Sequence, residues 1–402
     1  MKQSILVRIL CILLIACLMV NLTACSNNVS DETANSDKAE TSGETVSTGF
    51  KKIGVLCSPL SWGEENYRML QKYIEEYGDL IVVNTMPEDG DTQTIVSMMT
   101  QMANDPDIGA IVVDECCLGS IVGIKAVKSI NSDILVLGVQ IGDEPIEMSE
   151  VIDMACLPAF EELGNACADA AYAANLQYVV FETSADYLGS TATQKRLSGL
   201  TERCAEYGIE VITNILPNQN ETNNRPALVQ AAKEDISNKI SQYGDAVGFF
   251  PNSSFIYVPM IAQMIELKAG YLVGLADPGP FGPAYCDAFG IVAPDDHILD
   301  AEWTNAAIND AVVKAEMEGH FANWSFAFLS SFMAASIEYA FEYVDGKVGK
   351  NDVDEWMRLY MDINNITTED FSYTPFHSED GTSYDNILMI SGVFRYYGET
   401  LT

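Results

Sequence analysis

Polar side chains stand where apolar segments of this sequence end, as after the runs GVLC, AIVV and GFFP. They are mainly hydroxyls, amides and carboxylates, which together can hydrogen-bond a small polar solute bearing hydroxyl groups. One indole could stack on a sugar or base face. The candidate ligand-binding residues are Ser58, Trp62, Asp114, Glu115, Gln140, Glu182, Gln194, Asn252 and Asp277.

Each candidate also has a simpler structural explanation, and these alternatives stay open. Ser58 precedes a proline and could open a turn, while Trp62 could be a packing residue. Asn252 ends a predicted strand and could cap the helix that follows it. Glu115 fits a solvated or helix-capping residue better than a ligand contact. The carboxylates at strand ends raise a further alternative, a cationic ligand such as an amine.

Signatures of catalysis are missing from the sequence. It contains no G-x-S-x-G elbow, P-loop, H-E-x-x-H or G-x-G-x-x-G segment. Its histidines, the commonest general bases, are His297, His320 and His377, and none follows a predicted strand of the repeated region. The acidic segment PEDGD lacks the spacing of a calcium loop. We therefore expect no enzyme, no cofactor and no metal site.

Apolar segments alternate with amphipathic ones, which predicts parallel β-α-β units with right-handed crossovers. The strands predicted in the first half are residues 51–59, 79–85, 108–115 and 133–141. Those predicted in the second half are residues 177–183, 209–215, 246–252 and 271–277. Farther on, we expect helices near residues 301–318 and 323–345 and a late strand at 386–398.

The two halves resemble each other. EYGDLIVVN (76–84) and EYGIEVITN (206–214) share Glu, Tyr, Gly and Asn in register, within the same order of elements. We expect an α/β fold with two similar doubly wound parallel-sheet lobes joined by a hinge, and a C-terminal helical extension. Ligands of such sheets bind outside the carboxyl ends of the strands.

The expected domain boundaries follow from this pattern. The first lobe comprises residues 50–157 plus 288–350, and the second lobe comprises residues 158–287. The C-terminal extension comprises residues 351–402.

The N-terminus has the pattern of an export signal. Lys2 and Arg8 precede a 12-residue apolar run, which is shorter than the roughly 20 residues of a membrane-spanning helix. LTAC then places small residues before Cys25, as in a bacterial lipobox. We expect residues 1–24 to be a signal peptide, Cys25 to be lipidated, and residues 25–49 to be a disordered tether.

Charge and cysteine content narrow the possible partners. The net charge of −37 argues against a nucleic-acid partner, which would need a basic face. Seven cysteines follow Cys25, and most stand beside apolar residues, which favours buried thiols. The sequence has no second long apolar run, so nothing beyond the N-terminal segment suggests a membrane span.

The signal, the tether and the repeated lobes resemble a type I periplasmic binding protein, the class of ribose-binding proteins and of the sensor half of LacI-type repressors. They also resemble a lipoprotein family of anaerobic Gram-positive bacteria described only as periplasmic-binding. QKRLSGL (194–200) resembles the R-x-R-x-x-G-F pattern of the sugar binders, with Gln194 in place of the first arginine. Asn252-Ser253 keeps the asparagine of an Asn-Asp pair, and VGLAD places Asp277 one residue late. These departures weaken the case for a pentose or hexose.

The resemblance implies a solute-binding lipoprotein on the outer face of the cell membrane. Such a protein closes around a sugar- or nucleoside-like molecule and passes it to the membrane permease of an ABC-type importer. The alternative is a lipoprotein receptor subunit that uses the same closure to signal through a membrane sensor.

Overall fold

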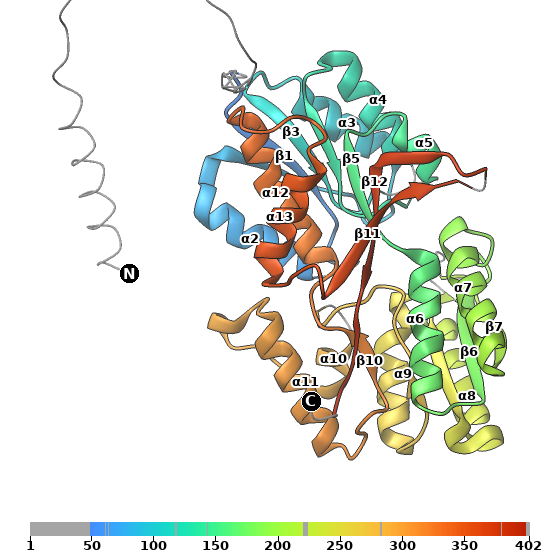
Figure 1. Cartoon of the computed structure of the whole chain (residues 1–402). Coiled ribbons are helices and arrows are strands. Elements are labelled where there is room, and N and C mark those ends of the chain that lie inside the picture. The colour runs from blue at the N-terminus through green and yellow to red at the C-terminus, as the bar shows by residue number, and fades with distance from the viewer. Residues whose placement is uncertain are drawn as a thin grey trace, which may run out of the picture. The chain divides into compact units, whose positions relative to one another are not determined.

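The computed structural model describes residues 49–398 except residues 61, 63, 117–118, 143, 220–223, 282–283 and 379 (Figure 1). The predicted signal peptide, Cys25 and residues 26–48 lie outside the described residues. Within the described part, no helix combines the length and hydrophobicity needed to cross a bilayer.

The first lobe is built on five parallel strands in the order β2-β1-β3-β4-β5. The strands are β1 (Lys52–Cys57), β2 (Ile81–Thr85), β3 (Ile108–Val113), β4 (Leu135–Gly138) and β5 (Met154–Pro158). The helices between them are α2 (Glu65–Tyr77), α3 (Thr92–Ala103), α4 (Ser120–Ile130) and the short α5 (Pro145–Ser149). Every residue of β3, β4 and β5 is buried, as expected for a parallel sheet covered on both faces.

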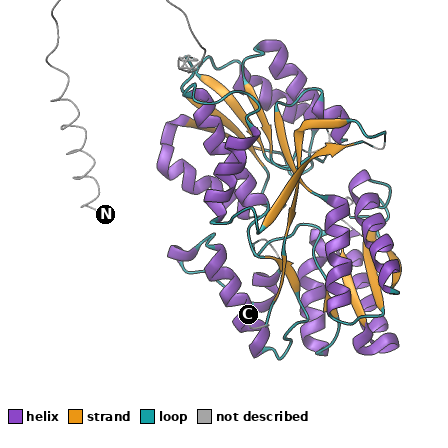
Figure 2. Cartoon of the chain, in the orientation of Figure 1, coloured by secondary structure: helices purple, strands orange, loops and turns teal. Residues whose placement is uncertain are grey.

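The second lobe is a four-stranded parallel sheet in the order β7-β6-β8-β9. Its strands are β6 (Tyr178–Ser184), β7 (Glu210–Leu216), β8 (Val247–Pro251) and β9 (Tyr271–Leu272). Its helices are α6 (Phe160–Ala173), α7 (Thr191–Tyr207), α8 (Arg225–Tyr243), α9 (Ser254–Leu267) and the short α10 (Tyr285–Phe289). Figure 2 shows the two groups of strands with helices beside each.

The predicted doubly wound α/β fold is confirmed, and the two lobes share one strand order. The order β2-β1-β3-β4 in the first lobe matches β7-β6-β8-β9 in the second. The residue after the third strand is held in the same way in both lobes. Asp114 donates its amide N–H to the Leu56 carbonyl at 2.9 Å, and Asn252 donates to the Glu182 carbonyl at 2.7 Å.

The C-terminal residues complete the first sheet. They form α13 (Val353–Asn364), β11 (Phe371–His377), β12 (Ser383–Gly392) and β13 (Phe394–Tyr396). β12 pairs in parallel with β5, and β11 pairs antiparallel with β12 at the edge (Figure 1). Residues 351–402, expected as an extension, therefore supply two strands of the seven-stranded sheet.

Residues 288–350 divide between two sets of neighbours. They form α11 (Ala301–Lys314), β10 (Ala322–Trp324) and α12 (Leu329–Val344). α12 packs on β1, β3 and α2, whereas α11 packs on α10, which lies against α9. The helix expected at 323–345 begins only at Leu329, because the residues before it pair with β13 as the antiparallel strand β10.

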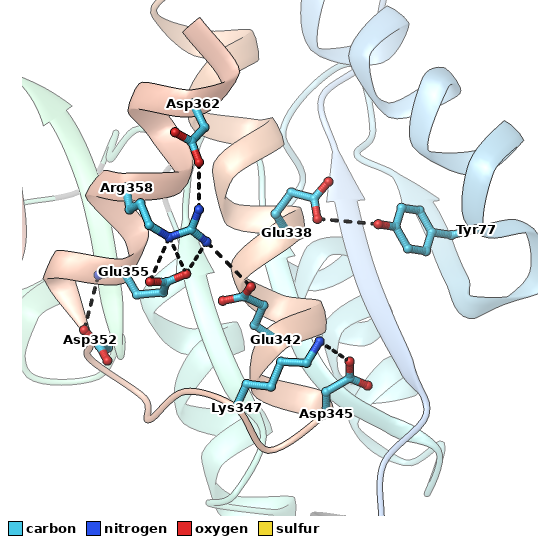
Figure 3. A network of polar contacts seen from close by, with 9 residues as sticks. All are labelled: Tyr77, Glu338, Glu342, Asp345, Lys347, Asp352, Glu355, Arg358 and Asp362. Atoms are coloured by element: carbon cyan, nitrogen blue, oxygen red, sulfur yellow. Dashed lines mark hydrogen bonds and ion pairs between the residues drawn. The ribbon is translucent and has the colours of Figure 1, made fainter. Parts of the chain in front are cut away.

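A polar network joins the exposed sides of α12 and α13 (Figure 3). Arg358 donates to Glu355 and, at 2.7 Å, to Asp362, and its guanidinium lies 3.8 Å from Glu342 of α12. Arg358 is 48% exposed, so these pairs contribute little to stability. The buried side of α13 contributes more, because Trp356 and Tyr360 stack there with 5.4 Å between ring centroids.

Candidate functional site

Each lobe has a point where its strand order reverses, between β1 and β3 in one and between β6 and β8 in the other. Adjacent crossovers leave in opposite directions there, which opens a crevice at the carboxyl ends of the strands. Ser58 and Asp114 follow the two strands of the first lobe, and Asn252 follows β8 of the second. The sequence analysis placed these three candidates at strand ends, which the structure confirms, and their role in ligand binding stays a prediction.

Asp114 is fully buried and joins three elements of the first lobe. One carboxylate oxygen accepts the Ser58 backbone N–H at 3.0 Å, and the other accepts the Asn66 side-chain amide of α2 at 2.5 Å. Burial raises the pKa of Asp114, while the hydrogen bonds from Ser58 and Asn66 act in the opposite direction. Asp114 therefore provides a buried carboxyl group at the carboxyl ends of β1 and β3.

Asn252 is also buried, and its amide bonds to the second lobe itself. Its Oδ1 accepts from Arg196 Nη1 at 3.0 Å, and its Nδ2 donates to Thr193 at 2.8 Å and Thr183 at 3.3 Å. Arg196 also donates through Nη2 to the Ala276 carbonyl at 3.1 Å. Asn252 thus holds α7 and Arg196 at the strand ends, and direct ligand contact by Asn252 stays a prediction.

Asp277 follows β9 and is anchored by α9. Tyr257 donates its hydroxyl to Asp277 Oδ2 at 2.9 Å, and the Asp277 backbone N–H lies 3.1 Å from the same hydroxyl oxygen. The charge of Asp277 raises the pKa of Glu65 and of Glu115, which belong to the first lobe. The negative charge of Asp277, in the second lobe, therefore acts on two carboxyl groups of the first lobe.

Four carboxyl groups thus form what we call the carboxylate cluster: Glu65, Asp114, Glu115 and Asp277. Burial, followed by the charges of Asp277 and Asp114, raises the pKa of Glu65 to about 8. Burial and the other three members hold the pKa of Glu115 well above its usual range. Glu65 therefore retains a proton near neutral pH. Among the described residues, no group of three or more His, Cys, Asp or Glu side chains is arranged to hold a metal ion.

Two candidate residues have strained backbones. Glu115 and Gln140, just beyond β3 and β4, have φ angles of 43° and 99°. Such values cost a non-glycine residue about 1–3 kcal/mol and are common at functional sites. Gln140 accepts the Cys116 backbone N–H at 2.7 Å, which ties the two strained segments together.

Three candidates make the following contacts outside the cluster. Glu182 is fully buried on the side of β6 that faces α8, where it accepts from Asn214 at 2.8 Å. Burial, followed by the charge of Asp235, holds the pKa of Glu182 well above its usual range. Gln194 is exposed and donates back to the Leu188 carbonyl, and the Trp62 ring lies beside Gly90.

The sequence analysis missed four residues around the cluster: Glu65, Asn66, Tyr257 and, as a site residue, Arg196. Glu65 and Asn66 open α2, the helix that follows β1 directly, and this position was the signal that could have identified them. Tyr257 had no such signal, because it occupies an ordinary buried position of the apolar helix α9.

Solved structures share this fold. A crystal structure from Clostridium difficile 630, provisionally described as a transcriptional regulator, has a TM-score of 0.72 at 20% identity, over 87% of this chain and 99% of that one. An ABC-transporter periplasmic solute-binding protein of Actinobacillus succinogenes 130z with bound D-allose has a TM-score of 0.50 at 15% identity, over 74% and 93%. An arabinose-transporter binding protein of Shewanella sp. ANA-3 also scores 0.50, at 11% identity, over 86% and 92%.

These likenesses establish the type I periplasmic binding protein fold for this chain. No curated protein matches its sequence. A family model does match, over residues 51–322, which cover both switch points and all four members of the carboxylate cluster. The chain belongs to the family described as "Protein of unknown function (DUF3798)".

Proposed function

We propose that this protein is an extracytoplasmic solute-binding protein that captures a small polar molecule between its two lobes. The observation that carries the proposal is the pair of matching switch points, with Asp114 at one and Asn252 at the other. Support comes from the charge of Asp277 in the second lobe, which contributes, after burial, to the raised pKa values of Glu65 and Glu115 in the first lobe. A solute bound there would contact both lobes at once.

Binding to both lobes explains how a membrane partner would distinguish the ligand-bound protein from the free protein. A ligand that contacts both lobes stabilises the closed arrangement by its differential affinity for that arrangement. A membrane permease of an ABC-type importer could then recognise the closed form. Sugar- or nucleoside-like molecules are the class that the sequence analysis placed first. Support comes from the shared fold with binding proteins solved with D-allose and with arabinofuranose.

The proposal includes a lipid anchor at Cys25 on the outer face of the cell membrane. Its support is the sequence LTAC after a 12-residue apolar run, followed by a polar segment. Buried acyl chains contribute about 0.8 kcal/mol per CH₂ group, so a diacylated cysteine would remain in the bilayer. The polar segment would let the lobes move freely above the membrane.

A second candidate is a ligand-sensing receptor subunit. The observation that favours it is the shared fold, at a TM-score of 0.72, with a protein provisionally described as a transcriptional regulator. Cross-linking in membranes separates the two roles, because an importer subunit captures a permease whereas a receptor subunit captures a membrane sensor.

A thermal-shift screen tests the binding function. The purified protein is heated with sugars, nucleosides and amines, and we expect at least one compound to raise the melting temperature. Asp277→Ala should abolish that rise. Glu210→Ala is the matched control, because Glu210 is an exposed carboxylate at the opposite, amino end of its strand. Equal shifts in both variants would refute the site.

A further inference from the structure

We propose that the solute carries a protonated amine, because the described residues around the carboxylate cluster present hydrogen-bond acceptors without donors and first-lobe carboxyl groups without a positive partner. The inference rests on the proposed solute-binding function and specifies the charge of the ligand. Hydroxyl groups elsewhere on the same ligand remain compatible with it, as in an amino sugar.

The buried amide of Asn66 is the first observation. Asn66 is only 4% exposed, and its Nδ2 donates to Asp114 at 2.5 Å. That bond fixes which end of the amide is the oxygen, since a flipped amide would set its oxygen against a carboxylate. Asn66 Oδ1 is buried and has no donor in the described part of the chain. A buried acceptor without a donor at the edge of a candidate site calls for an N–H or O–H group from a ligand.

Two further amides repeat this pattern. Gln140 Oε1, beyond β4, and Gln219 Oε1, beyond β7, are buried oxygens without a donor in the described residues. Both follow strands at the carboxyl edge where the carboxylate cluster lies. The unsatisfied atoms of all three amides are acceptors. An ammonium group has three donors and no acceptor, so it matches such a surface.

The charge balance is the second observation. Among the described residues, the guanidinium whose charge acts on a member of the cluster is that of Arg196, which acts on Asp277. Both terminal nitrogens of Arg196 already bond to Asn252 and to the Ala276 carbonyl. The charged groups that act on Glu65 and Glu115 are other cluster members. Without a ligand, protons balance part of this charge, and a bound cation would take their place.

Proton exchange gives the inference a distinctive pH dependence. When an ammonium group binds, Glu65 releases its proton to the buffer, while the ligand keeps its own. Affinity should then rise by up to about tenfold per pH unit for each proton released, until the pH passes the pKa of Glu65 near 8. The other titratable and charged groups that interact with the cluster are Asp114, Asp277, Cys57, Tyr187 and Arg196. A neutral sugar would show no such rise.

The experiment works with an unidentified ligand. A bacterial small-molecule extract is divided on a cation-exchange resin into a retained fraction and a flow-through fraction. Each fraction is added to the purified protein at pH 6 and at pH 7.5, and the melting temperature is measured. We expect the retained fraction alone to stabilise the protein, and to do so more strongly at the higher pH.

Two variants complete the test. Glu65→Gln should remove most of the stabilisation and its pH dependence, whereas Glu210→Gln should preserve both. Melting temperatures without extract show that each variant is folded. Stabilisation by the flow-through fraction alone would overturn the inference about charge and leave solute binding intact. No stabilisation by either fraction would overturn the proposed function itself.

Discussion

Replacing Gly199 with alanine should destabilise the second lobe, because two helices cross there backbone to backbone. A Cβ atom at Gly199 of α7 would lie 2.2 Å from the Glu161 carbonyl oxygen of α6. A Cβ at Gly164 of α6 would lie 2.2 Å from the Arg196 carbonyl oxygen. Real Cβ atoms essentially never approach closer than 3.0 Å, so the helices would have to separate by about 0.8 Å.

The magnitude follows from two opposing terms. Overpacking a tight contact costs about 1–3 kcal/mol, and the upper end applies here because the opposing atoms are backbone and cannot rotate away. Alanine in place of glycine inside a helix returns up to about 1 kcal/mol. We therefore expect Gly199→Ala to lower the free energy of unfolding by about 2 kcal/mol. Arg196 lies one turn earlier on α7 and would move with the helix.

Denaturant unfolding followed by circular dichroism measures this change. Gly189→Ala is the matched control, because no atom lies within 4 Å of its Cβ position and its φ angle is not positive. The control should change the stability by less than about 0.5 kcal/mol. Equal stability of Gly199→Ala and the unmodified protein would refute the close crossing of α6 and α7.

Three further predictions concern buried groups. Arg196→Leu should cost about 1–3 kcal/mol in denaturant unfolding, because it removes the donor to buried Asn252 and leaves polar atoms unpaired. The unliganded protein should lose stability from about pH 4.5 to pH 8, because folding raises the pKa of Glu65 from 4.5 to about 8. The folded form holds a proton that the unfolded form has lost, so the loss is at most about 1.4 kcal/mol per pH unit for that proton. Thermal melts across this range should show a shallower slope in Glu65→Gln, and an unchanged slope would contradict the raised pKa. Trp356→Ala should cost about 3–5 kcal/mol in denaturant unfolding, and a loss below about 1 kcal/mol would contradict the packing of α13.

The sequence predicted the parts of the fold that depend on local pattern. Apolar strands followed by amphipathic helices are visible over a few residues, and the repeated EYG segments revealed the duplication. The pairing of β12 with β5 and of β10 with β13 was not visible. Those contacts join segments far apart in the chain, and the apolar residues of β10 resembled the start of the helix that follows them.

In the candidate site, too, the sequence showed local features but not contacts between distant segments. Asp114, Asn252 and Asp277 could be proposed from the sequence because a strand end is a local feature, and their binding role stays a prediction. The partners that give these residues their roles come from other elements, such as Asn66 of α2. Glu182 was placed near a strand end correctly, but its side chain faces α8, and side-chain alternation along a strand does not reveal which face a helix covers.

Native mass spectrometry tests the central claim most directly. The purified protein is incubated with a bacterial small-molecule extract, desalted gently and weighed intact. The account predicts one small-molecule adduct per chain, lost in Asp277→Ala and retained in Glu210→Ala. A mass equal to that of the chain alone, or an adduct that persists in Asp277→Ala, would contradict solute binding at the carboxylate cluster.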